Sequence, residues 1–169
     1  MVEIMIAMMV FALSAAGLVS ALTQTSKFNR FNQEKVTAKL AAESTLESML
    51  ATNFEDLWTS FNADGADDPG GVDSAPGATF AVTALSSQAV DPDGIVGRVE
   101  FPSAAGLIRE DHVDAALNMP RDLNLDRIID AEDHSADARI LPVRIRSEWT
   151  GVSGDQFYEI LYLFSDLAN

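Results

Sequence analysis

The chain has 169 residues, a formal net charge of −15, no cysteine and 47% hydrophobic residues. Its length fits one domain, or one domain with an appendage, because domains usually contain about 100 to 200 residues. The excess of carboxylates repels phosphate backbones, so no nucleic acid is expected as a partner. The lack of cysteine excludes thiol catalysis, thiolate metal sites and disulfides, so any additional clamp must come from packing, a metal ion or a partner chain.

The first segment in chain order is an uncharged apolar run from Ile4 to Leu22. At 1.5 Å per residue in a helix, this run is just long enough to cross a hydrocarbon core of about 30 Å. A secretory signal peptide is a poor alternative, because no basic residue precedes the run and the acidic Glu3 stands where one is expected. The run therefore predicts a membrane-spanning helix.

The helical pattern continues beyond this run as an amphipathic segment. No Gly or Pro occurs from Thr23 to Leu57, and apolar residues recur there at mostly helical spacing. They are Phe28, Phe31, Val36, Leu40, Leu46, Met49, Leu50, Phe54 and Leu57. One helix from about residue 2 to residue 52 would be roughly 75 Å long. We expect its first half to be covered by lipid or by copies of itself, and its second half to bury the apolar stripe on a sheet.

Charge divides the chain into a neutral part and an acidic part. Residues 1–52 contain four glutamates and four basic residues, whereas residues 53–169 contain 22 acidic residues and seven arginines. We therefore expect three regions. Residues 1–23 form the transmembrane or filament-core half of the helix, residues 24–58 form its amphipathic half, and residues 59–169 form an acidic, β-rich globular head.

The head begins with a loop rich in Gly, Pro and Asp between residues 61 and 78, and strand candidates follow it. These candidates are 79–85, 95–101, 140–149 and 156–164. The turn Asp91-Pro92-Asp93-Gly94 precedes the second candidate, and residues 151–154 join the last two as a hairpin. The simplest fold that accommodates these elements is α+β, with an antiparallel sheet packed on the C-terminal half of the long helix.

The N-terminal segment Met1-Val2-Glu3-Ile4-Met5-Ile6-Ala7-Met8-Met9-Val10-Phe11-Ala12-Leu13 resembles the N-terminus of type IV pilins and of the pseudopilins of type II secretion. In that family a leader peptidase cuts before a short apolar stretch that contains one glutamate, then methylates the new terminus, and a long apolar helix follows. Glu3 matches that glutamate, while the leader and the cleavage-site glycine would precede Met1. The resemblance covers roughly the first 50 residues and does not extend to the head.

This resemblance implies a pilin-like α+β fold and a structural role rather than an enzymatic one. The subunit would be stored in the inner membrane and processed by prepilin peptidase. The assembly machinery would then build it, with identical or homologous pilin subunits, into an extracellular or periplasmic helical filament. Glu3 would pair with the terminal amine of a neighbouring subunit. The alternative from another class is a monomeric, membrane-anchored periplasmic domain that binds calcium or another ligand.

One segment of the head has the spacing of an EF-hand-type calcium loop. Its oxygen-bearing side chains are Asp122, Asn124, Asp126, Asp130 and Asp133, and Ile128 at the seventh position would supply its backbone carbonyl. Arg127 replaces the usual glycine at the sixth position, and Asp133 is shorter than the usual glutamate at the twelfth. The segment predicts Ca²⁺ as a cofactor, with a solvated acidic loop as the alternative.

Catalysis finds little support in the sequence. His112 and His134 lie among acidic residues, but neither has a second histidine at ligand spacing. We interpret both as solvated surface histidines. We therefore predict no catalytic residues and no enzymatic activity.

Overall fold

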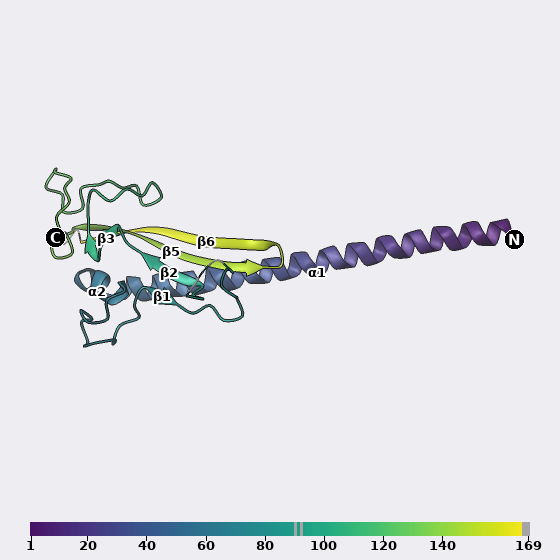
Figure 1. The fold of residues 1–169 in the computed structure, drawn as a ribbon, viewed down its shortest axis with the longest axis horizontal. Coiled ribbons are helices and arrows are strands. Elements are labelled where there is room, and N and C mark those ends of the chain that lie inside the picture. Colours follow the sequence, from purple (N-terminus) through teal and green to yellow (C-terminus); the bar gives the residue numbers. More distant parts are fainter. Residues whose placement is uncertain (90, 92, 167–169) are drawn as a thin grey trace.

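A single long helix carries a small head at its C-terminal end (Figure 1). The computed structural model describes residues 1–89, 91 and 93–166. The helix, α1 (Val2–Leu50), has 49 residues and is therefore roughly 74 Å long at 1.5 Å per residue. Every residue from 1 to 30 is exposed. The predicted long helix is confirmed, and it ends two residues earlier than expected.

Two short helical turns reverse the chain after α1. They are η1 (Phe54–Asp56) and α2 (Leu57–Phe61). Asn53 has an extended backbone that separates them from α1. Leu57 and Phe61 are buried in the main core, so these turns close one end of the head.

The head is built on a four-stranded antiparallel sheet with the order β1-β2-β5-β6. The strands are β1 (Thr79–Phe80), β2 (Gly97–Glu100), β5 (Ile140–Gly151) and β6 (Gly154–Ser165). A separate two-stranded sheet pairs β3 (Ser103–Ala104) with β4 (Leu107–Ile108). The α+β class, with an antiparallel sheet on the second half of the long helix, is confirmed.

The predicted strands differ in how well they agree with the structure. The last two candidates are confirmed as the long β5–β6 hairpin, and the second is confirmed as the shorter β2. The first candidate, 79–85, is wrong beyond Phe80. There the chain turns, with a hydrogen bond from the Leu85 N–H to the Val82 carbonyl and a positive φ of 68° at Ala84. The small β3–β4 pair was not predicted, and Pro92 of the predicted turn lies outside the described residues.

The packing of α1 on the head uses two small residues together with part of the predicted stripe. Ala38 and Ala42 are fully buried against β5 and β6, together with Met49. Small side chains let the helix backbone approach the sheet closely, and Trp149 of β5 packs against Ala38. The predicted burial of the stripe is confirmed for Met49 and Leu57, and Leu46 and Phe54 pack partly buried against the same core. It is wrong for four members, which are more than half exposed. They are Phe28, Val36, Leu40 and Leu50.

Candidate functional site

The N-terminal half of α1 is an apolar surface that the head does not cover (Figure 1). The helix is long and apolar enough to cross a membrane, and none of its most apolar 18-residue window is buried. Glu3, the predicted assembly residue, lies exposed in the first helical turn, where the helix dipole favours a negative charge. Because this end projects away from the head, only lipid or another molecule can contact it.

A second exposed apolar surface lies on α1 beyond the predicted span. We call it the outer stripe, and it consists of Phe28, Val36, Leu40 and Leu50, which are 63%, 53%, 60% and 52% exposed. At about 100° per residue, these four side chains fall on one face of roughly 120°. The buried residues Ala38, Ala42 and Met49 project from a different face. The same helix therefore has one face that packs on its own sheet and another that remains uncovered.

The predicted calcium loop lies within residues 109–139, a segment that contains neither helix nor strand. Its predicted ligands mostly accept hydrogen bonds from the backbone of their own segment. The Asp122 carboxylate accepts from the N–H groups of Leu125 and Arg127 at 2.6 and 2.7 Å. The other four side chains each accept from the N–H group two residues further along the chain: Asn124 at 3.0 Å, Asp126 at 2.7 Å, Asp130 at 2.8 Å and Asp133 at 3.1 Å. Arg127 has a φ of 77°, which is the left-handed region that favours the glycine expected at this position.

Of the six predicted ligands, only Asp130 joins a compact group of possible metal ligands among the described residues. Its other members are Glu110 and His134, and one ligand atom from each lies within 4.8 Å of the other two. His134 Nε2 is 3.1 Å from Asp130 Oδ1 and 3.8 Å from Glu110 Oε2. These three side chains could hold a metal ion.

Glu110 is a fully buried carboxylate with one satisfied oxygen and one open oxygen. Its Oε1 accepts hydrogen bonds from the backbone N–H groups of Leu123 at 2.5 Å and Asn124 at 3.1 Å. Its Oε2 has no hydrogen-bond partner among the described residues and faces His134. Leaving a buried polar atom without a partner is unfavourable, typically by about 1 to 3 kcal/mol and by more for a charged group. The open oxygen therefore needs a physical explanation.

His134 is buried at 4% exposure, so its interpretation as a solvated surface histidine is wrong. Its Nε2 faces Asp130, and its Nδ1 lies 3.0 Å from Asp137 Oδ1. Burial opposes the charged imidazolium, but the hydrogen bonds with Asp130 and Asp137 and the nearby Glu110 charge outweigh it and raise the pKa of His134. Both ring nitrogens therefore have a carboxylate oxygen at hydrogen-bond distance.

Backbone hydrogen bonds hold this group against the head. The N–H of His134 donates to the carbonyl of Ile108 in β4 at 2.9 Å, and the N–H of Asp111 donates to the carbonyl of Asp130 at 3.0 Å. The N–H of Arg121 donates to the carbonyl of Glu110 at 3.1 Å. The two ends of the irregular segment therefore meet at one place.

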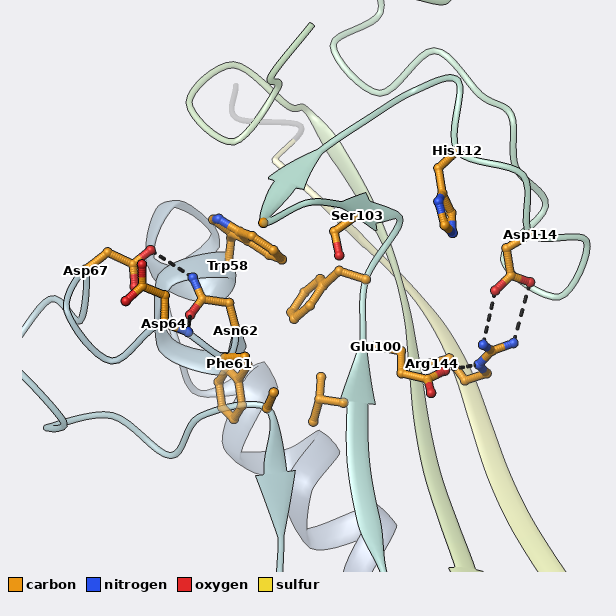
Figure 2. A pocket seen from close by; sticks show the side chains of 15 residues that line it. Trp58, Phe61, Asn62, Asp64, Asp67, Glu100, Ser103, His112, Asp114 and Arg144 are labelled. Atoms are coloured by element: carbon orange, nitrogen blue, oxygen red, sulfur yellow. Dashed lines mark hydrogen bonds and ion pairs between the residues drawn. The ribbon is translucent and has the colours of Figure 1, made fainter. Parts of the chain in front are cut away.

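A cavity of about 620 Å³ lies on another side of the head, between α2 and the strands β2 and β3 (Figure 2). Trp58 and Phe101 form part of its aromatic wall in an edge-to-face pair with ring centroids 5.2 Å apart. Its charged wall is an ion-paired network in which Arg144 contacts Glu100 and, at 3.1 Å, Asp114. The half-buried His112 also lines this cavity, so His112 and His134 belong to separate sites.

Sequence reasoning missed Glu110 and Asp137. The spacing Asp130-x3-His134-x2-Asp137 was a local signal of a polar cluster, because it places two carboxylates within four residues of His134. Glu110 is 20 residues from Asp130, and no periodic element connects them. Only the packing of the irregular segment brings Glu110 to His134.

Relationships to known proteins were sought at three levels. Comparisons with protein-family models, with curated proteins and with solved structures found no match.

Proposed function

We propose that the chain is the subunit of a helical filament, a type IV pilus or a type II secretion pseudopilus, and that it is held in the inner membrane before assembly. The observation that carries this proposal is the outer stripe, which lies beyond the apolar span and on a face of α1 that the head leaves open. The N-terminal resemblance to pilins and pseudopilins supports the same role.

Two exposed apolar regions of α1, the apolar span and the outer stripe, must be shielded from water. Lipid can cover Ile4 to Leu22 in a membrane, but it cannot reach the far end of the outer stripe at Leu50, roughly 42 Å along the helix from Leu22. Burial of a large apolar side chain is favourable by about 1.5 to 3 kcal/mol. Helices of neighbouring subunits would cover both regions at once, with the heads on the outside of the bundle.

Glu3 would set the register of this assembly. A carboxylate near the end of an apolar helix is costly in a helix bundle unless a cation neutralises it. In the proposed filament this cation is the terminal amine of a neighbouring processed subunit. Prepilin peptidase and the assembly machinery are the further partners in this proposal, and the role is structural rather than enzymatic.

The alternative is a monomeric, membrane-anchored periplasmic domain, which would use the same anchor and the same head. It gives the outer stripe no covering partner, which is why we favour the filament. Calcium at the Asp122–Asp133 loop is compatible with both functions and stays a prediction. Calorimetry of the full chain in detergent with millimolar Ca²⁺ tests it, and the absence of both heat and a melting shift would contradict it.

The filament proposal is tested in cells by Glu3→Ala and Leu40→Gln. Both variants should remain in the membrane with a folded head, because neither side chain is buried, and both should reduce incorporation into filaments at least tenfold. Glu55→Ala and Ser48→Gln are the matched controls, since both residues are exposed and neither belongs to the outer stripe. Electron microscopy of sheared filaments measures the result.

The absence of native cysteine allows a second readout without background. A single Ser14→Cys substitution in the exposed apolar half should give oxidative cross-links between subunits in assembled fibres. Normal filaments from both Glu3→Ala and Leu40→Gln, or only monomers in the wild type with no cross-links, would contradict the proposal and favour the anchored domain.

A further inference from the structure

The open oxygen of Glu110 points to a ligand that the protein chain does not itself provide. Glu110 is completely buried, and its Oε2 has no hydrogen-bond partner among the described residues. That oxygen lies 3.8 Å from His134 Nε2, which in turn lies 3.1 Å from Asp130 Oδ1. We propose that Glu110, Asp130 and His134 bind one divalent transition-metal ion of the Zn²⁺ class, which fixes the irregular segment 109–139 to the head.

The spacing of the three ligand atoms fits such an ion. Zinc in proteins is tetrahedral, with ligands at about 2.0 to 2.2 Å, so two of its ligand atoms lie roughly 3.3 to 3.6 Å apart. The observed separations of 3.1 and 3.8 Å lie on either side of this range. The third separation, between Glu110 and Asp130, is at most 4.8 Å, so side-chain adjustments would bring the three atoms onto one ion.

The chemistry of the ligands selects the class of metal. Calcium takes six to eight oxygen ligands at about 2.3 to 2.6 Å, whereas this group offers one imidazole nitrogen and two carboxylates. Imidazole together with carboxylate suits zinc and related transition metals. The site is therefore distinct from the predicted calcium loop, although both would use Asp130.

A third carboxylate holds the histidine in the orientation that metal binding needs. Asp137 Oδ1 lies 3.0 Å from His134 Nδ1, and Asn124 Nδ2 donates to Asp137 Oδ2 at 3.2 Å. Such a carboxylate fixes the tautomer of a metal-bound histidine and directs its other nitrogen at the ion. Nε2 would then bind the ion through its lone pair, and any proton on that nitrogen would leave to solvent.

The position of the group in the chain gives the ion a structural role. Glu110 lies near the start of the 109–139 segment, and Asp130 and His134 lie near its end. Irregular segments of this length are uncommon inside a compact domain. Because this chain has no cysteine, no disulfide can hold the ends of the segment together. The side chain of Asp130 is 37% exposed, which gives an ion a path from solvent.

The test uses the full chain in detergent micelles after removal of metal with EDTA. One equivalent of Zn²⁺ should bind in calorimetry and raise the melting temperature. Any rise in melting temperature caused by millimolar Ca²⁺ should be the same in the wild type and in Glu110→Gln. Co²⁺ should bind in the same place and give the visible absorption of a low-coordinate site that includes nitrogen. This spectrum is independent of the stability of the fold.

Variants separate a metal site from a simple ion-pair cluster. Glu110→Gln keeps an oxygen for the Leu123 and Asn124 N–H groups, so it should fold and should weaken Zn²⁺ binding at least tenfold. Asp130→Asn, at a partly exposed position, should weaken it similarly. Asp137→Asn should weaken it by about 10- to 100-fold, as expected for a group that orients a ligand.

His112→Ala is the matched control, because His112 is the only other histidine and lies at a separate cavity. It should bind Zn²⁺ as the wild type does. The proposal is overturned if the wild type does not bind Zn²⁺, if Glu110→Gln and Asp130→Asn bind it normally, or if His112→Ala abolishes binding. Filament assembly enters none of these measurements, so this proposal can fail or succeed independently of the proposed function.

Discussion

The two halves of α1 use apolar side chains in opposite ways. In the half that carries the head, Ala38 and Ala42 are fully buried, while the larger Leu40 between them is 60% exposed. In the N-terminal half, large apolar residues surround the helix on every side. The comparison teaches that folding of the head and covering of the rod depend on different faces of one helix. Substitutions can therefore separate the two.

The largest expected difference between the two faces concerns Trp149 and Phe28. Trp149 is fully buried between α1 and the sheet, whereas Phe28 is exposed on the rod. Trp149→Ala should lower the free energy of unfolding of the head by about 3 to 5 kcal/mol, and Phe28→Ala should change it by less than about 0.5 kcal/mol. Chemical denaturation in micelles, followed by circular dichroism, measures both. Similar losses for the two variants would remove the distinction between the faces.

A smaller effect is expected where the helix meets the sheet. Ala42 is fully buried in the core, so Ala42→Leu should overpack the contact and destabilise the head by about 1 to 3 kcal/mol. Leu40→Ala removes an exposed side chain and should leave stability within about 0.5 kcal/mol of the wild type. The same denaturation experiment compares them. A tolerant Ala42→Leu would mean that the helix is not packed tightly on the sheet.

The smallest expected effect is confined to the surface of the head. A hydrogen bond from Arg98, together with the N–H of Ile95, lowers the pKa of Asp93 to about 2. Because the pKa is lower in the folded state than the ordinary 3.8, this interaction stabilises the head above about pH 4 and is lost as the pH falls toward 2. Arg98→Gln should return the pKa of Asp93 toward its ordinary value in an NMR titration, while the rod is unaffected. An unchanged pKa in that variant would exclude Arg98 as the cause.

The elements that depend on local pattern could be predicted from the sequence. The helix follows from a long stretch with no proline and only Gly17 before residue 57, and the β5–β6 hairpin follows from alternation on both sides of a Gly-containing turn. The strand predicted at 79–85 stopped early because alternation alone does not reveal the turn after Phe80. Phe80 of β1 packs directly on Gly97 of β2, where any side chain would collide.

The face of the helix that packs on the sheet could be predicted only in part by counting large apolar residues. Periodicity correctly includes Met49, but it also includes the exposed Phe28, Val36 and Leu40 and leaves out the buried Ala38 and Ala42. The group of Glu110, Asp130 and His134 was also not predicted. Glu110 and His134 lie in a segment without periodicity, so only the tertiary packing of that segment determines that they meet.

The hairpin between β5 and β6 determines how the molecule would stand on a bilayer. The hairpin runs along α1 (Figure 1). Val152, at its uncharged tip, lines one pocket with Lys27 and Arg30, which lie roughly 8 to 12 Å beyond Leu22 at 1.5 Å per residue. The headgroup layer extends about 5 to 7 Å from the hydrocarbon on each side, so cations and a neutral tip lie nearest to the lipid. Most of the carboxylates lie further out, where an anionic surface repels them. A subunit tethered in this way would hold its outer stripe outside the bilayer, open to a neighbour arriving from the side.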